Sequence, residues 1–207
     1  MGCEYLGLAA TGAAVLIAGL TGGMACGKSF VAQALRDLGA HVIEADELGH
    51  QVIAPGGEAH AQVVAAFGDA DRAKLARAVF GKPEELAKLT AIVHPAVRER
   101  SRRMIEQIAL KCPHAVVVYV AAILLESGGL PGMSKMVVVN CTPAQQLARA
   151  LERPGVTEAS VRARLEHQLP AEDKLARADY VIDTGGTKEE TLRQTKMVFE
   201  ELRKLAA

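Results

Sequence analysis

Short apolar segments alternate with longer amphipathic segments along most of this chain. The apolar segments are rich in valine, isoleucine and leucine, which is typical of parallel strands buried on both faces. The longer segments repeat apolar residues every three or four positions, as helices with one buried face do. Strands are therefore predicted at 15–20, 41–44, 115–120, 135–140 and 180–183. Their alternation with helices predicts an α/β fold in which a five-stranded parallel sheet is flanked by helices.

One long segment departs from this alternation, because it shows helical periodicity and little strand pattern. Helices are expected there at 59–67, 71–80, 83–93 and 96–111. Asp71 is suited to cap the second helix, Pro83 to begin the third, and His94-Pro95 to separate the last two. The predicted domains are a helical insertion at 47–113, a core made of 15–46 and 114–207, and an N-terminal extension at 1–14.

A glycine-rich turn follows the first predicted strand and ends in Gly-Lys-Ser. Gly22, four free positions, Gly27, Lys28 and Ser29 match the phosphate-binding loop pattern, or P-loop. The turn can wrap a phosphate closely because glycine lacks a Cβ, and its amides and the following helix attract anions. Lys28 is suited to neutralise β- and γ-phosphates, and the Ser29 hydroxyl to hold Mg²⁺. The alternative, an ordinary turn with a surface lysine, does not explain why a buried strand precedes the loop and a helix over 28–38 follows it.

Asp46 comes directly after the second predicted strand. Ligands of open α/β sheets bind at the carboxyl ends of the strands, where a carboxylate can accept a hydroxyl proton or hold a metal-bound water. The alternative is that Asp46 caps a helix over 47–52, and spacing alone favours that cap. The two roles are compatible.

Two predicted helices of the second half, at 143–153 and 158–168, are joined by a short turn and carry Arg149, Arg153, Arg162 and Arg164. Thr142 is suited to cap the first. Phosphoryl transfer needs cations over the developing charge, so a helical lid is predicted within about 146–170. The alternative is a set of surface arginines paired with Glu152, Glu158 and Glu166. Further helices are expected at 170–178 and 188–205.

Arg98 and Arg102 lie four positions apart, on one face of the predicted helix at 96–111 and close to His94. Such a face could bind an anion. The alternative, slightly favoured by the sequence, is a solvated surface in which these arginines pair with Glu99 and Glu106.

Composition narrows the possible partners. The 24 basic and 24 acidic side chains balance, so no net field attracts nucleic acid or an anionic membrane. Aromatic residues make up 3% of the chain, which disfavours a platform for stacking bases. We therefore expect neither nucleic acid nor a membrane as partner.

The four cysteines Cys3, Cys26, Cys112 and Cys141 are scattered, without a C-x-x-C pair. This argues against zinc and against a disulfide framework, and for the reducing cytosol. The apolar start of the chain lacks the basic residues of a signal peptide and is short for a membrane span, so a cytoplasmic protein is expected. Cys26 lies inside the loop. The simpler interpretation is that Cys26 is a small residue which the loop tolerates, and the alternative is that its thiol acts as a nucleophile.

These motifs together resemble those of the dephospho-CoA kinase family. The segments that carry the resemblance are 20–29, Glu44-Ala45-Asp46, Pro55-Gly56, His94-Pro95, Gln146 with Arg149 and Arg153, Gln168, and 178–183. The resemblance implies a P-loop kinase fold and transfer of the ATP γ-phosphate to the ribose 3′-hydroxyl of dephospho-CoA, the last step of coenzyme A synthesis. ATP and Mg²⁺ are the implied cofactors and dephospho-CoA the small-molecule partner, and a monomer or weak homo-oligomer is expected.

The resemblance also implies roles for single residues. Asp46 would be the base for the 3′-hydroxyl, and Lys28 and Arg149 would act on the phosphates. The implied nucleotide-binding residues are Gly22, Gly23, Met24, Ala25, Cys26, Gly27, Lys28, Ser29, Phe30, Arg153 and Thr184, and Ser29 is also the implied ligand of Mg²⁺. The implied coenzyme-binding residues are Asp46, His94, Arg98 and Glu126.

Four positions depart from the family pattern. Phe30 stands where a threonine is usual, Glu44 where an aspartate is usual, and Tyr119 near the usual site of a second metal-anchoring carboxylate. Thr184 stands in place of a frequent asparagine. Two other functions therefore stay open: another small-molecule or nucleoside monophosphate kinase, and a degenerate kinase that binds nucleotide without turnover.

Overall fold

The computed structural model describes residues 15–166 and 168–207. The predicted extension at 1–14 lies outside the described residues, and so do the side chains of Arg164 and Glu166. The strands are β1 (Leu16–Gly22), β2 (His41–Glu44), β3 (Val116–Val120), β4 (Lys135–Asn140) and β5 (Tyr180–Asp183). The helices are α1 (Lys28–Asp37), α2 (Ala45–Ile53), α3 (His60–Phe67), α4 (Arg72–Val79), α5 (Pro83–Lys111), α6 (Pro143–Leu151), α7 (Glu158–Glu166), α8 (Ala171–Leu175) and α9 (Lys188–Ala206).

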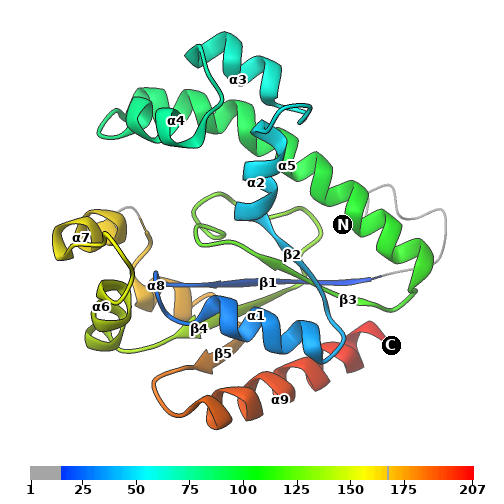
Figure 1. The fold of residues 1–207 in the computed structure, drawn as a ribbon. Helices are drawn as coiled ribbons and strands as arrows, with labels where there is room; N and C mark the ends of the chain where they lie inside the picture. The colour runs from blue at the N-terminus through cyan, green and yellow to red at the C-terminus, as the bar shows by residue number, and fades with distance from the viewer. Residues whose placement is uncertain (1–14, 167) are drawn as a thin grey trace. The chain divides into compact units, whose positions relative to one another are not determined.

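The described strands form one five-stranded sheet in the order β2-β3-β1-β4-β5 (Figure 1). β1 pairs in parallel with β3 on one side and with β4 on the other, and β4 pairs in parallel with β5. Gly22, the last residue of β1, lies opposite Val139 near the end of β4. The segments that follow β1 and β4 therefore leave the sheet next to each other, at its carboxyl edge.

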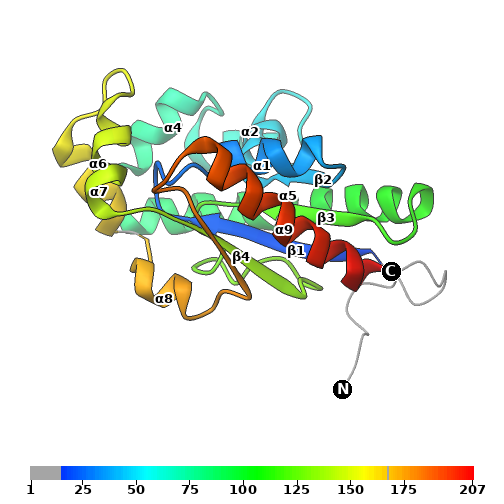
Figure 2. The ribbon, with the colours of Figure 1, turned by 90° about the horizontal axis from the view of Figure 1, so that it is seen from below.

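The main core lies between one face of the sheet and two helices. Leu20 and Val118 from the strands pack in one cluster with Val31 of α1 and with Phe199 and Leu202 of α9. Figure 2 shows α9 running across the sheet beside α1. The valine-rich strands are apolar on both faces, and β3 is buried along its whole length, as predicted for a sheet with covered faces.

The chain divides into two compact units. One comprises the chain up to Ile43 and from Gln107 onward, and the other is Glu44–Glu106. The sequence analysis set these boundaries at 46/47 and 113/114, and that assignment of domains stays a prediction. The second unit holds α2, α3, α4 and most of α5.

The predicted helix break at His94-Pro95 is wrong. α5 runs without interruption from Pro83 to Lys111, with Pro95 inside it. Proline removes one backbone hydrogen bond from a helix interior, but the turns on both sides keep theirs. After Pro95 the helix buries Val97, Ser101 and Ile105 at intervals of four, so one face continues to favour the helix.

The predicted caps at Asp71 and Thr142 are confirmed. The Asp71 side chain accepts hydrogen bonds from the amides of Ala73 and Lys74 at the start of α4. Thr142 and Gln145 form a reciprocal capping box at the start of α6. The predicted strands agree with the structure to within two residues at each end. α6, α7 and α8 end two or three residues earlier than the sequence predicts.

Candidate nucleotide-binding site

The glycine-rich loop lies between β1 and α1, as predicted. A Cβ at Gly22 would collide with the backbone carbonyl oxygen of Val139, so the neighbouring strand leaves no room for a side chain there. Gly27 is the N-cap of α1 with φ +83°, a conformation that favours glycine. Its carbonyl accepts the amides of Phe30 and Val31, which begin the helix. The two outer glycines of the motif are thus required by the turn itself.

Lys28 holds its ammonium group over the loop. Nζ donates to the carbonyl oxygens of Gly22 and Gly23, each at 2.8 Å. Ser29 follows at the second position of α1, and its side chain is exposed. A fixed cation and a helix N-terminus next to each other are suited to bind a phosphate chain.

The segment after α7 reaches back to the loop. The amide of Met24 donates to the side-chain oxygen of Gln168 at 3.2 Å. The amide nitrogen of Gln146 lies so close to Gly23 that a Cβ there would collide with it. Both ends of the predicted lid segment, 146–170, therefore contact the loop through glutamine side chains.

Arg149, Thr184 and the loop also meet. Arg149 donates to the Thr184 hydroxyl at 3.1 Å and to the Thr184 carbonyl at 2.6 Å. The hydroxyl lies 3.0 Å from the carbonyl oxygen of Cys26 and 3.1 Å from that of Asn140. Arg153, one turn after Arg149, is exposed. The structure thus brings together Arg149, Thr184 and Cys26, which the sequence analysis had placed at the nucleotide.

Cys26 and Cys141 form a buried thiol pair. The two Sγ atoms lie 3.0 Å apart, and the residues are 4% and 6% exposed. Burial raises the pKa of Cys141 to about 12, and the contact with Cys26 adds to this shift. The sequence gives no local signal for this pair, because 115 positions separate the two cysteines.

Glu126 contacts the end of the predicted lid and the helix that follows it. Its Oε1 accepts the amide of Leu169 at 2.8 Å and lies 3.0 Å from Nζ of Lys174. Only 2% of the Lys174 side chain is exposed. Burial raises the pKa of Glu126, but hydrogen bonds from the Leu169 amide, its own amide and Lys174 outweigh it and hold the pKa below its ordinary value. Lys174 was not foreseen from the sequence.

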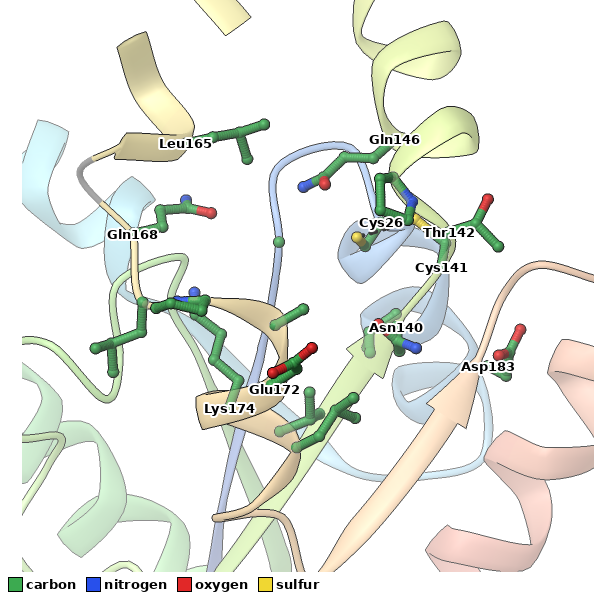
Figure 3. Close-up of a pocket in the computed structure, with 18 residues that line it drawn as sticks. Cys26, Asn140, Cys141, Thr142, Gln146, Leu165, Gln168, Glu172, Lys174 and Asp183 are labelled. Atoms are coloured by element: carbon green, nitrogen blue, oxygen red, sulfur yellow. Dashed lines mark hydrogen bonds between the residues drawn. The ribbon is translucent and has the colours of Figure 1, made fainter. Parts of the chain in front are cut away.

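A cavity of about 760 Å³ opens between these elements (Figure 3). Its wall combines the end of β4, the loop residues Gly23 and Cys26, and the segment from Leu165 to Leu175. Gln146, Gln168 and Lys174 place polar groups in a largely apolar wall. Cavities of this size and composition are typical of small-molecule sites.

Two of the predicted cationic residues are paired at the surface. Arg162 in α7 forms an ion pair with Glu158 at 2.5 Å, as the alternative interpretation expected. Arg102 in α5 contacts both Glu99 and Glu106, again as the alternative expected. Their guanidinium groups are thereby neutralised in this structure.

His94 and Arg98 lie one turn apart in α5. Burial, and then the positive charge of Arg98, lower the pKa of His94 below 6.5. A neutral imidazole beside a guanidinium can offer one hydrogen-bonding group and one charge to an anionic ligand.

Asp46 lies in the first turn of α2 and its side chain is exposed. The expectation that Asp46 caps this helix is wrong, because the N-cap is Glu44 and the helix begins at Ala45. The helix starts at Ala45, two residues before the expected start at 47, so the Asp46 carboxylate is not engaged as a cap.

Among residues 15–166 and 168–207, no three His, Cys, Asp or Glu side chains gather as ligands for a metal ion. Within the same residues, no helix combines the length and apolar character needed to cross a membrane.

Comparison with known proteins identifies the family. A family model described as dephospho-CoA kinase matches residues 16–190. A dephospho-CoA kinase of Geobacillus kaustophilus is 43% identical over 194 residues, which are 90% of this chain and 96% of the relative. The solved structure of TT1252 from Thermus thermophilus is 31% identical, with a TM-score of 0.76, and the match covers 90% of this chain and 97% of that one.

A dephospho-CoA kinase from Campylobacter jejuni shares the fold at 23% identity, with a TM-score of 0.59 and coverage of 91% and 97%. The fold with its five-stranded parallel sheet is similar to that of these two solved structures. The chain belongs to the dephospho-CoA kinase family.

Proposed function

We propose that this chain transfers the γ-phosphate of ATP to the ribose 3′-hydroxyl of dephospho-CoA, giving CoA and ADP. The observation that carries the proposal is the loop from Gly22 to Ser29, with the Lys28 ammonium fixed over it, in a member of this family. Phosphoryl transfer requires little covalent work from the protein and depends on positioning and on neutralising charge. A rigid loop and a fixed lysine supply both.

ATP binds with its phosphates in the loop. The nucleotide residues of the proposal are those of the loop, Phe30, Arg153 and Thr184, and Arg149 acts on the transferred phosphate. Ser29, exposed at the second position of α1, fits as a ligand of Mg²⁺, which neutralises charge on the phosphates when it is bound. The lid within 146–170 moves with the nucleotide, because its two glutamines contact the loop.

The acceptor is held by the helical insertion. Asp46 takes the proton of the 3′-hydroxyl, and its exposed carboxylate in the first turn of α2 is available for this task. His94 and Arg98 bind phosphate or ribose groups of the coenzyme, the first as a neutral hydrogen-bonding partner and the second as a charge. Glu126 completes the coenzyme side through its second carboxylate oxygen, since the first is committed to Leu169 and Lys174.

The experiment is an assay of the purified chain with Mg-ATP and dephospho-CoA, in which CoA and ADP are measured separately. Formation of equal amounts of CoA and ADP, with no phosphorylation of AMP, supports the proposal. ADP formation with AMP as acceptor would support another small-molecule kinase. ATP binding without consumption of any acceptor would support a degenerate kinase. Cytoplasmic location and a monomer or weak homo-oligomer stay predictions.

A further inference from the structure

The thiols of Cys26 and Cys141 are brought together by the register of the sheet. β1 and β4 are neighbours, with Gly22 opposite Val139. Cys26 lies four residues after the first of these and Cys141 two residues after the second. The two chain segments therefore leave the sheet side by side, and the Sγ atoms come within 3.0 Å of each other. Their proximity is a property of the fold rather than of a single side-chain conformation.

Both thiols are buried from bulk solvent but line the same cavity (Figure 3). Hydrogen peroxide is small enough to fit within this cavity of about 760 Å³. Cys112, by contrast, is exposed and is not part of this wall. A small oxidant that enters the cavity meets two adjacent thiols at once.

We propose that Cys26 and Cys141 are a site of reversible oxidation, at which a hydroperoxide converts the thiol pair into a disulfide that locks the nucleotide loop. In the first step the Cys26 sulfur attacks hydrogen peroxide, the O–O bond breaks, and the Cys26 proton leaves with the released hydroxyl as water, which gives Cys26 sulfenic acid. In the second step the Cys141 sulfur attacks the Cys26 sulfur, the S–O bond breaks, and the Cys141 proton leaves with the hydroxyl as water. Two thiols and one peroxide thus yield one disulfide and two waters.

The order of the two steps follows from the surroundings of the thiols. Burial holds the pKa of Cys141 at about 12, so this thiol is protonated at neutral pH and reacts poorly with peroxide on its own. Cys26 precedes Gly27, the N-cap of α1, and belongs to the loop that enters this helix. Cys26 is therefore the thiol that is oxidised first, and Cys141 resolves it.

The disulfide would change the loop. A disulfide bond is about 2.05 Å long, whereas the sulfur atoms lie 3.0 Å apart. Closing this gap pulls Cys26 toward the segment after β4 and moves the amides that cradle phosphate. Displacements of about 1 Å at a reacting site cost up to about 100-fold in rate. This consequence, unlike the disulfide itself, rests on the proposed kinase function.

The test compares variants of the whole chain before and after treatment with hydrogen peroxide, with and without later dithiothreitol. Trypsin does not separate Cys3 from Cys26, since no lysine or arginine lies between them. The disulfide is therefore mapped in a Cys3→Ser/Cys112→Ser double variant, which keeps only the proposed pair. We expect a tryptic cross-link between the peptides of Cys26 and Cys141 that dithiothreitol removes. We also expect CoA formation to fall by about ten-fold or more on oxidation and to recover on reduction.

Cys141→Ser is the decisive variant, and Cys112→Ser is its matched control. Prolonged peroxide should inactivate Cys141→Ser in a way that dithiothreitol does not restore, because Cys26 sulfenic acid has no partner thiol there and is oxidised further, whereas Cys112→Ser should recover like the parent chain. Absence of the cross-link from folded parent protein overturns the proposal, whether or not the chain forms CoA. Recovery of Cys141→Ser by dithiothreitol to the same extent as the parent chain also overturns it. If Cys141→Ser fails to fold, Cys141→Ala takes its place. A chain that forms the cross-link without making CoA when reduced retains the oxidation site and refutes the kinase proposal alone.

Discussion

The amide of Met24 in the glycine-rich loop donates a hydrogen bond to the side-chain oxygen of Gln168, 144 residues further along the chain. An amide at this point of a P-loop is one that a phosphate oxygen can use. In the proposed complex with ATP, a phosphate oxygen would compete with Gln168 for this amide.

This relationship predicts the effect of charge at position 168. Gln168→Glu keeps the shape of the side chain but sets a negative charge beside the phosphates, so the KM for ATP should rise by about ten-fold or more. Gln168→Ala removes the contact without adding charge, and its KM should change much less. Steady-state kinetics at saturating dephospho-CoA measure both. Equal KM values for the two variants would show that Gln168 does not approach the bound nucleotide.

Asp46 is predicted to act as a general base. Asp46→Asn should lower turnover by about 10²–10⁴-fold and leave ATP affinity nearly unchanged, because the amide cannot take the hydroxyl proton. The neighbouring Glu47 also lies in the first turn of α2 and is exposed, so Glu47→Gln is a matched loss of one negative charge. Its turnover should stay close to that of the parent. ATP affinity is measured separately by titration, and similar turnover in both variants would remove Asp46 from the mechanism.

The buried pair of Lys174 and Glu126 should be important for stability. Glu126→Gln leaves the ammonium of Lys174 buried without its counter-charge, which should cost about 3–5 kcal/mol of the free energy of unfolding. Lys174→Met likewise leaves the carboxylate of Glu126 without its counter-charge. The double variant removes both charges and should recover most of the loss.

Urea unfolding of the two single variants and the double variant measures this coupling. Lys204→Met is the matched control, since Lys204 forms an exposed ion pair with Glu201 at 2.6 Å. Its removal should change stability by less than about 1 kcal/mol. If the double variant loses the sum of the free energies of unfolding lost by the two single variants, the two side chains do not stabilise each other.

His94 should make stability depend on pH. Its pKa is lowered in the folded chain by burial and by Arg98, so the unfolded chain binds more protons just below the ordinary value of 6.5. The free energy of unfolding should therefore fall as the pH drops below that value, and rise again toward neutral pH. His94→Gln should show a smaller fall than the parent. Urea unfolding of the parent and of His94→Gln at about pH 7.5 and about pH 5.5 measures this difference. An equal fall in the free energy of unfolding of both chains would contradict the lowered pKa of His94.

The sequence predicts the parts of this molecule that have a local pattern. Apolar strands, the helix after the loop and the caps at Asp71 and Thr142 all agree with the structure, because each depends on residues within a few positions. The break predicted at Pro95 failed because one lost hydrogen bond does not outweigh the continuing buried face of α5. The cap predicted at Asp46 failed because α2 begins at Ala45, two residues earlier than its pattern suggests.

Contacts between distant segments could not be predicted in this way. Lys174 looks like a surface lysine in the sequence, yet it is buried against Glu126, 48 positions away. The thiol pair of Cys26 and Cys141 likewise arises only when β4 takes its place beside β1. Arg162 shows the reverse case, since its neighbour Glu158 was visible in the sequence as a partner one helical turn away.

Thr184 has one hydroxyl proton and two carbonyl oxygens, those of Cys26 and Asn140, within reach of it. The hydroxyl of Thr184 can donate its proton to only one of these carbonyl oxygens at a time, while Arg149 donates a hydrogen bond to the hydroxyl oxygen. One hydroxyl group therefore joins the glycine-rich loop to the end of β4, and the guanidinium of Arg149 fastens α6 to the same point.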